Sequence, residues 1–337
     1  MQRYSIFLET LDEYLNCYII TQKGLSKNTQ RSYKYTFQLL LEFFYRIHRR
    51  SSDTLLFSDL TYENLTCFLD WIEGTRKCSV STRNQRLAAL KSFSTYAQLR
   101  NIDASTVFRN SILKIPTKKT SYKELSFFTF DEVRFLLEAV EDSTIGRRNK
   151  ALLAFMYASG ARSQEVCDVR IRDIIFTTPY ATVILYGKGN KNRRISIPER
   201  PTQILLNYLK EIGKYGKTDE YVFSSQINTH MSIACIEEIF KKYIAIARRQ
   251  HPEYFTGKYS PHTMRHTTAT HMVEAGISLL IIKNFLGHSS IETTQIYAKV
   301  TEQHIKSHIS KWNTQWLHTD TSKTKNHDNC PEFLKLK

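Results

Sequence analysis

The sequence predicts a mainly α-helical protein with one small β-hairpin, an α+β fold class, arranged in two domains. Apolar residues recur at helical spacing behind serine or threonine caps through most of the chain. Two strand-like runs, Ala181–Tyr186 and Arg194–Ile197, flank a turn of glycine, asparagine and lysine. A polar, basic, proline-bearing stretch separates two segments that are each long enough for a core. We expect a helical domain over 1–113, a linker over 114–125, a second domain over 126–317 and a polar, disordered tail over 318–337.

The charge balance favours a polyanionic partner. The chain has 337 residues, with 48 lysines and arginines against 32 aspartates and glutamates, which gives a net charge of +16. Such an excess attracts phosphates. A basic surface can also bind anionic lipid, but the sequence has no strongly amphipathic basic anchor and no apolar run near the roughly 18 residues of a membrane span. Nucleic acid is therefore the favoured partner, and no membrane association is expected.

The six cysteines are scattered along the chain without a CxxC pair. This spacing argues against a zinc site or a disulfide framework and fits a reducing compartment. The first residues also lack the apolar core of a secretory signal. We therefore expect a cytoplasmic protein without a metal site.

Helix signals fill the first domain. The apolar residues from Ile6 to Ile19 lie at helical spacing, and Gly24 ends that element. Three further helices are expected to begin after caps at Ser26, Thr61 and either Ser79 or Ser81. Their apolar stripes form the core of a small helical bundle.

Basic residues gather near the starts of two of these helices. Charged runs are most often solvated surface, and that interpretation stays open here. The functional alternative is contact with the phosphates of a nucleic acid. The candidate residues are Lys27, Arg31, Lys34, Arg83, Arg86 and Lys91.

The second domain opens with a capping-box pattern, Thr129 and Glu132, ahead of an apolar helix. The run from Arg147 to Ser159 reads as a buried helix that ends at Gly160. This ending places Arg162 at the start of the following turn or helix. After the hairpin, two more helices are expected, over 201–212 and 232–249.

The segment from Ser260 to Tyr297 carries the residues with the most chemistry. Ser260 is a good N-cap with a proline behind it, and a spacing of three sets His262 and Arg265 on one helical face. His288 and Tyr297 follow after two glycine breaks. Arginine can hold phosphate oxygens in a planar fork, histidine can move protons, and tyrosine can become a covalent nucleophile. Each side chain taken singly is more often a packing residue, but the combination favours attack on a phosphate.

With these residues the chain resembles a tyrosine recombinase of the phage integrase family. The family signature is arginine, lysine, His-x-x-Arg, histidine or tryptophan, and tyrosine, in that order. The matching positions are Arg162, Lys188, His262, Arg265, His288 and Tyr297. The family's frequent acidic residue, three positions after the first arginine, corresponds to Glu165. Lys191 competes with Lys188 for the lysine position.

The resemblance implies cleavage of DNA through a 3′-phosphotyrosyl linkage, with no metal, cofactor or ATP. A tyrosine hydroxyl, with an ordinary pKa near 10, needs charge stabilisation and proton removal to attack a phosphodiester. The implied roles are phosphate binding for Arg162, Arg265 and His288, protonation of the leaving 5′ oxygen for Lys188, proton transfer at Tyr297 for His262, and an orienting role for Glu165.

The resemblance also implies partners. A helical core-binding domain and a catalytic domain would close around double-stranded DNA at specific recombination sites, in a bacterial-type protein associated with the nucleoid. The active form would be a homo-oligomer, a tetramer in the synaptic complex, and the need for accessory proteins stays open. An apolar stripe from Ile305 to Trp316 would dock on a neighbouring protomer or pack within its own domain.

Several functions remain to be separated. Integration, excision or transposition of a mobile element is preferred, on the basicity and the tail, over chromosome-dimer resolution. An enzyme of the type IB topoisomerase kind would share the chemistry but need no specific site. A DNA-binding protein that has lost catalysis is disfavoured by the intact six-residue set, and a metal hydrolase by the lack of an acidic-histidine cluster.

Overall fold

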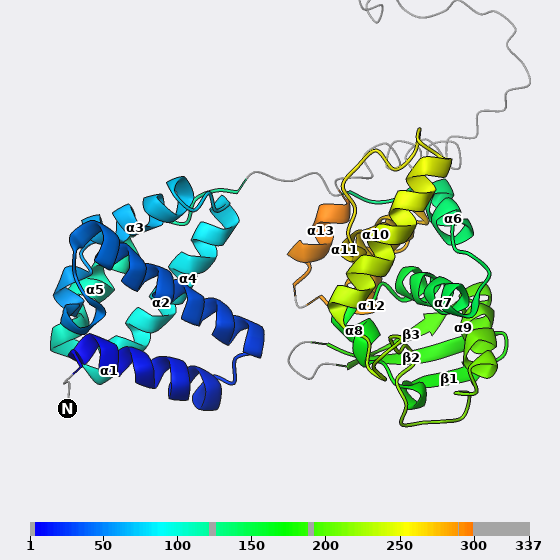
Figure 1. Cartoon of the computed structure of the whole chain (residues 1–337), viewed down its shortest axis with the longest axis horizontal. Helices are drawn as coiled ribbons and strands as arrows, with labels where there is room; N and C mark the ends of the chain where they lie inside the picture. The colour runs from blue at the N-terminus through cyan, green and yellow to red at the C-terminus, as the bar shows by residue number, and fades with distance from the viewer. Residues whose placement is uncertain (1–3, 121–125, 188–191, 289, 299–337) are drawn as a thin grey trace, which may run out of the picture. The chain divides into compact units, whose positions relative to one another are not determined.

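The computed structural model describes residues 4–120, 126–187, 192–288 and 290–298, and it contains two compact units, Met1–Lys123 and Glu124–Lys337 (Figure 1). Most described residues are helical, and the strands form one small sheet. The predicted fold class, mainly α with a small sheet, is therefore confirmed. The domain limits expected from the sequence stay predictions.

The first unit is a bundle of helices (Figure 1). Its elements are α1 Ile6–Glu13, the π-helix η1 Tyr14–Gln22, α2 Lys27–His48, the short 3-10 turns η2 Ser52–Thr54 and η3 Phe57–Asp59, α3 Tyr62–Gly74, α4 Val80–Arg100 and α5 Ile102–Lys114. The hydroxyls of Ser26, Thr61 and Ser79 each accept a hydrogen bond from a backbone N–H in the first helical turn, as N-caps do. The sequence did not indicate α5.

Aromatic rings fill the core of the first unit. Phe93 of α4 is fully buried, and Phe7 and Phe37 meet it edge to face at ring-centroid distances of 5.9 and 5.0 Å. The chain beyond α5 also packs on this unit: Ile115 is buried, and Lys118 exchanges backbone hydrogen bonds with the side chain of Asn84. The start of the expected linker thus contacts α4.

The second unit places helices around a three-stranded antiparallel sheet of order β1-β2-β3 (Figure 1). Its elements are α6 Phe130–Glu138, α7 Thr144–Ser159, α8 Ser163–Asp168, η4 Ile171–Asp173, β1 Ile174–Thr177, β2 Tyr180–Tyr186, β3 Asn192–Ile197, α9 Glu199–Glu211, α10 Ile233–Gln250, α11 Pro261–Glu274, α12 Leu279–Leu286 and α13 Glu292–Ala298. The predicted hairpin is β2–β3, and β1 is an additional strand beside it.

Helix α11 is central to the second unit, because it contacts α7, α10, α12 and α13. The segment before it is held by Glu132. The predicted capping box at Thr129 forms, and Glu132 Oε1 also accepts hydrogen bonds from Phe255 N at 2.8 Å and Tyr259 Oη at 3.0 Å. A carboxylate with several lone-pair sites can serve both purposes. The start of α11 is thereby fixed relative to α6.

Some expectations fall outside the described residues. These are the lysine of the hairpin turn, Lys188 or Lys191, the stripe from Ile305 to Trp316, and the tail over 318–337. Among the described helices, none is long and apolar enough to cross a membrane.

Candidate active site

Two helix ends meet at the site. Helix α7 ends at Gly160 with φ 55°, and α12 ends at Gly287 with φ 66°, both in the left-handed region that glycine adopts without strain. A Cβ on Gly160 would also lie 2.8 Å from Leu286 Cδ2, so the two ends are in close contact. Carbonyl groups at helix C-termini lack partners within the helix and need other donors.

Arg265 supplies those donors. Its Nη1 donates to Gly160 O at 2.7 Å and its Nη2 to Leu286 O at 2.6 Å, and the residue is only 2% exposed. Burial, together with the charges of Arg162 and Arg193, lowers the pKa of Arg265 to about 9. The guanidinium still carries its charge at neutral pH and is a fixed cation between α7 and α12.

Glu165 connects two further arginines. Its carboxylate accepts from Arg162 Nη1 at 2.9 Å and, in bidentate fashion, from Arg193 Nη1 and Nη2 at 2.8 and 2.7 Å. Arg193 Nε also donates to Phe285 O at 2.8 Å, which ties β3 to α12. Burial alone would raise the pKa of Glu165, but the hydrogen bonds and charge of Arg193, and then Arg162, outweigh it and lower that pKa. The ionised carboxylate therefore orients both guanidinium groups.

Tyr297 of α13 lies in a small apolar cluster with Ala269, Ile282 and Leu286. Its side chain is buried, but its hydroxyl lies 2.8 Å from His266 Nδ1. Burial raises the pKa of Tyr297 above its ordinary value, and the charges of Arg265 and Arg162 act in the opposite direction. At neutral pH the hydroxyl is protonated and held in one place.

Two further histidines, His288 and His262, lie close to the pair formed by His266 and Tyr297. The ring of His288 stacks parallel to the ring of Tyr297 at 6.4 Å, and its Nδ1 lies 2.9 Å from Thr294 Oγ1. The ring of His262 is 5.3 Å from that of His266. Burial, followed by neighbouring positive charges, lowers the pKa of His266 and of His288 to about 4 and lowers that of His262 as well. All three imidazoles are therefore neutral at pH 7.

The structure brings five of the residues selected from the sequence into one neighbourhood: Arg162, His262, Arg265, His288 and Tyr297. Lys188 and its competitor Lys191 lie outside the described residues.

His266 was not among the residues selected from the sequence. His262 was expected beside Tyr297, but the described contact with the Tyr297 hydroxyl comes from His266. The reason is helical geometry: four residues make about one turn, so both histidines lie on one face of α11, and α13 packs beside the later one. The spacing His262, Arg265, His266 was the available signal.

Arg193 was missed as well. Strand periodicity could have found it, because residues two apart in a strand share a face. Ile195 and Ile197 are buried, so Arg193 had to point the same way, toward the interior, and needed an anion there.

Among the residues that the structure describes, no group of three or more histidine, cysteine, aspartate or glutamate side chains is arranged to hold a metal ion.

Acid should destabilise the second unit before its carboxylates titrate. The pKa values of His266 and His288 fall to about 4 on folding, and that of buried His271 is lowered too. The unfolded chain then binds more protons than the folded one, so the free energy of unfolding decreases as the pH falls from about 6.5 toward 4. Each histidine contributes at most about 1.4 kcal/mol per pH unit. Melting temperatures at pH 7 and pH 5 check this expectation. Between these two pH values, the melting temperature of the double variant His266→Asn, His288→Asn should fall less than that of wild type. An equal loss in both proteins would contradict it.

Comparison with known proteins agrees with this geometry. Residues 126–304 match the phage integrase family, and residues 11–101 match the phage integrase N-terminal SAM-like domain. The tyrosine recombinase XerA of Pyrococcus furiosus is 31% identical over 317 residues, which cover 93% of this chain and 97% of that protein. The tyrosine recombinase XerC of Caldanaerobacter subterraneus subsp. tengcongensis is 28% identical over 316 residues, covering 89% and 86%.

A solved structure shares the fold. The XerH site-specific recombinase bound to a palindromic difH substrate matches 91% of this chain and 88% of its own, with a TM-score of 0.69 and 20% identity. From the matched families and relatives, the chain belongs to the phage integrase family.

Proposed function

We propose that this chain is a tyrosine-type site-specific DNA recombinase that cuts and rejoins DNA strands through Tyr297. One observation carries the proposal: the Tyr297 hydroxyl is held by a neutral histidine within the field of two arginines. The phenol supplies a nucleophile and the arginines supply the positive charge that a phosphate needs. Membership of the phage integrase family supports the same reaction.

In the proposed reaction, Tyr297 Oη attacks a DNA phosphorus atom, and the bond to the 5′ oxygen breaks. Arg162 and Arg265 bind the nonbridging oxygens, where negative charge concentrates in the transition state. Nδ1 of His288 is within hydrogen-bond distance of Thr294 Oγ1, so we assign the other ring nitrogen, Nε2, to the phosphate. The leaving 5′ oxygen takes a proton from Lys188. A 5′ hydroxyl of a partner duplex then attacks the 3′-phosphotyrosyl linkage, and the strands are exchanged without ATP.

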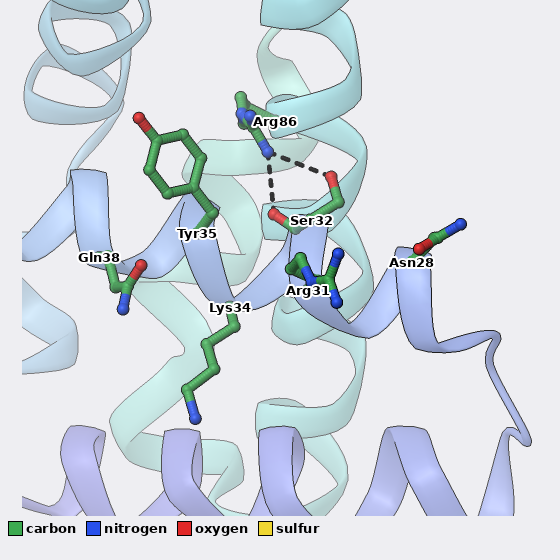
Figure 2. A pocket seen from close by; sticks show the side chains of 7 residues that line it. All are labelled: Asn28, Arg31, Ser32, Lys34, Tyr35, Gln38 and Arg86. Atoms are coloured by element: carbon green, nitrogen blue, oxygen red, sulfur yellow. Dashed lines mark hydrogen bonds between the residues drawn. The ribbon is translucent and has the colours of Figure 1, made fainter. Parts of the chain in front are cut away.

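The first unit offers a surface for the DNA backbone. A hollow of about 550 Å³ lies between α2 and α4, and Arg31 and Lys34 of α2 are exposed there. Figure 2 shows Arg86 reaching across from α4 to Ser32, with hydrogen bonds of 2.9 Å to the carbonyl and 3.1 Å to the hydroxyl. Its guanidinium also lies over the Tyr35 ring, at 5.0 Å. We assign phosphate contacts to Lys27, Arg31 and Lys34, with Arg86 as the support of this surface.

Two basic residues selected from the sequence do not fit this surface. Arg83 is only 3% exposed, and it donates to Pro116 O at 3.2 Å and pairs with Glu73 at 3.6 Å. Lys91 donates to Ile115 O at 2.9 Å. Both connect α4 to the segment after α5, because a buried or half-buried cation needs acceptors inside the protein. We therefore assign structural roles to Arg83 and Lys91 in place of the DNA contacts that the sequence indicated.

Salt dependence tests the proposed surface. Each phosphate contact contributes about 0.9 to the slope of log affinity against log salt. The double variant Arg31→Ala, Lys34→Ala should therefore bind double-stranded DNA more weakly and with a shallower slope. Arg46→Ala is the matched control, since Arg46 lies on the same helix but pairs with Glu42 at 2.8 Å. An unchanged slope in the double variant, measured by fluorescence anisotropy, would move the DNA surface elsewhere.

A topoisomerase-like enzyme is the second candidate, because it would share the cleavage chemistry. A plasmid with two recombination sites separates the two functions in EDTA without ATP. A recombinase deletes or inverts the segment between the sites, whereas a relaxing enzyme removes supercoils from a plasmid that carries no site.

For the biological role, we propose integration, excision or transposition of a mobile element by a homotetramer, with chromosome-dimer resolution as the alternative. The net charge of +16 supports a DNA-dominated function. Mapping covalent attachment to the ends of the element or to a chromosomal site distinguishes the roles.

A further inference from the structure

We propose that His266 takes the proton of the Tyr297 hydroxyl when DNA is cleaved and returns it when the strands are rejoined. This inference rests on the proposed function, because it assigns a step within the reaction of Tyr297. His266 is not part of the six-residue signature from which the site was predicted.

The geometry places His266 against the reacting atom. Its Nδ1 lies 2.8 Å from Tyr297 Oη, within the range of a proton-transfer hydrogen bond, and the two rings are 5.7 Å apart and inclined by 49°. Arg265 precedes it on α11 and is anchored at both ends of its guanidinium, so the helix is fixed at this turn. The charged or titratable groups facing His266 are His262 and Arg265 from α11, His288 from the segment before α13, and Tyr297 itself.

The protonation states suit the step. His266 is neutral at pH 7, since burial, then the neighbouring His262 imidazole and the charge of Arg265, lower its pKa to about 4. Tyr297 keeps its proton, because burial raises its pKa. The hydroxyl therefore donates, Nδ1 accepts, and the imidazole hydrogen resides on Nε2.

As the Oη–phosphorus bond forms, the phenol becomes strongly acidic and its proton moves to Nδ1. The bond to the 5′ oxygen breaks, its electron pair stays on that oxygen, and Lys188 supplies the proton there. The negative phosphate stabilises the imidazolium, which offsets the low proton affinity of His266 in the free protein. Rejoining runs in reverse, and the imidazolium returns its proton to the tyrosine oxygen.

A second histidine–tyrosine pair on the same helix shows what distinguishes His266. His271 Nδ1 lies 2.8 Å from Tyr157 Oη, so the distance alone is compatible with packing. Burial, reinforced by Glu274, raises the pKa of Tyr157 to about 12. At Tyr297 the neighbouring charges are those of Arg265 and Arg162, which favour loss of the proton. Of these two pairs, the one at Tyr297 combines an acceptor with cations that stabilise the product of the transfer.

The test is single-turnover formation of the covalent adduct on a nicked suicide duplex that carries the recombination site. Two substrates are compared, one with the natural 5′ oxygen and one with a bridging 5′ sulfur, which leaves as a thiolate without a proton. His266→Ala should slow the reaction about 100-fold or more on both substrates, the usual size of a general-base contribution. His266→Asn offers an oxygen to the hydroxyl but accepts no proton, so it should be similarly slow. Lys188→Ala should be slow on oxygen and restored on sulfur.

His271→Asn is the matched control, since it removes the same kind of buried contact from the same helix, and its cleavage rate should stay near that of wild type. Thermal melting and DNA affinity identify any variant that has not folded. If His266→Ala fails that check, the cleavage rate of His266→Asn is used to judge the inference. The inference is overturned if either His266 variant cleaves at the wild-type rate, or if sulfur restores its rate. Failure of the proposed function looks different, because wild type itself would then form no adduct.

Discussion

Replacing Tyr297 with phenylalanine should abolish covalent attachment to DNA while leaving a folded protein. The change removes one oxygen from a buried ring that packs on Ala269 and Leu286. The lost hydrogen bond to His266 should cost about 1 kcal/mol of folding free energy, so melting and DNA binding should be nearly those of wild type. No adduct should form on the suicide duplex, because no hydroxyl remains to attack the phosphate.

Tyr157→Phe is the matched control for that experiment. The Tyr157 hydroxyl also lies within hydrogen-bond distance of a histidine of α11, 2.8 Å from His271 Nδ1, but Tyr157 has no assigned role in the reaction. This variant should form the adduct at the wild-type rate. Formation of the covalent adduct by Tyr297→Phe would exclude Tyr297 as the nucleophile.

Lysine in place of either site arginine should lower the cleavage rate about 100-fold, which corresponds to about 3 kcal/mol of lost transition-state stabilisation. Lysine keeps the charge but loses the planar fork that holds two oxygens. The two variants should differ in stability. Arg265 binds two helix-end carbonyls in the interior, and leaving one unpaired should cost about 2 kcal/mol. Arg162 is more exposed, and its partner Glu165 keeps the bidentate contact with Arg193, so replacing Arg162 should cost less.

Rapid-quench cleavage and urea unfolding measure the two effects separately. Arg172→Lys is the control, because Arg172 pairs with Asp219 on an exposed surface, at 2.7 Å. Wild-type cleavage rates in both Arg162→Lys and Arg265→Lys would refute the arginine assignments, and equal stability of the two would refute the structural role of Arg265.

The sequence was sufficient for the elements whose signals are local. Caps at Ser26, Thr61 and Ser79, the capping box at Thr129, and the glycine break at Gly160 all act within one turn, so each helix start or end could be located without tertiary information. The strong apolar spacing likewise indicated the helical class.

What the sequence did not provide depends on contacts between distant segments. Glu165 and Arg193 are 28 residues apart and meet only because β3 packs beside α8 and α12. The basic cluster on α4 looked like surface, but Arg83 is buried against Pro116, which follows α5. Similarly, the choice of His266 over His262 depends on where α13 settles along α11. The pattern of charged residues in the sequence therefore shows neither the partner of each side chain nor how deeply that side chain is buried.

The most direct test of the account identifies the residue that becomes attached to DNA. Wild-type protein is incubated with the suicide duplex in EDTA without ATP, the denaturant-resistant adduct is isolated and digested with protease, and the DNA-linked peptide is sequenced by mass spectrometry. We expect a single 3′-phosphotyrosyl linkage, in the peptide that contains Tyr297. A linkage to any other of the 19 tyrosines, or to the 5′ side of the break, would contradict it.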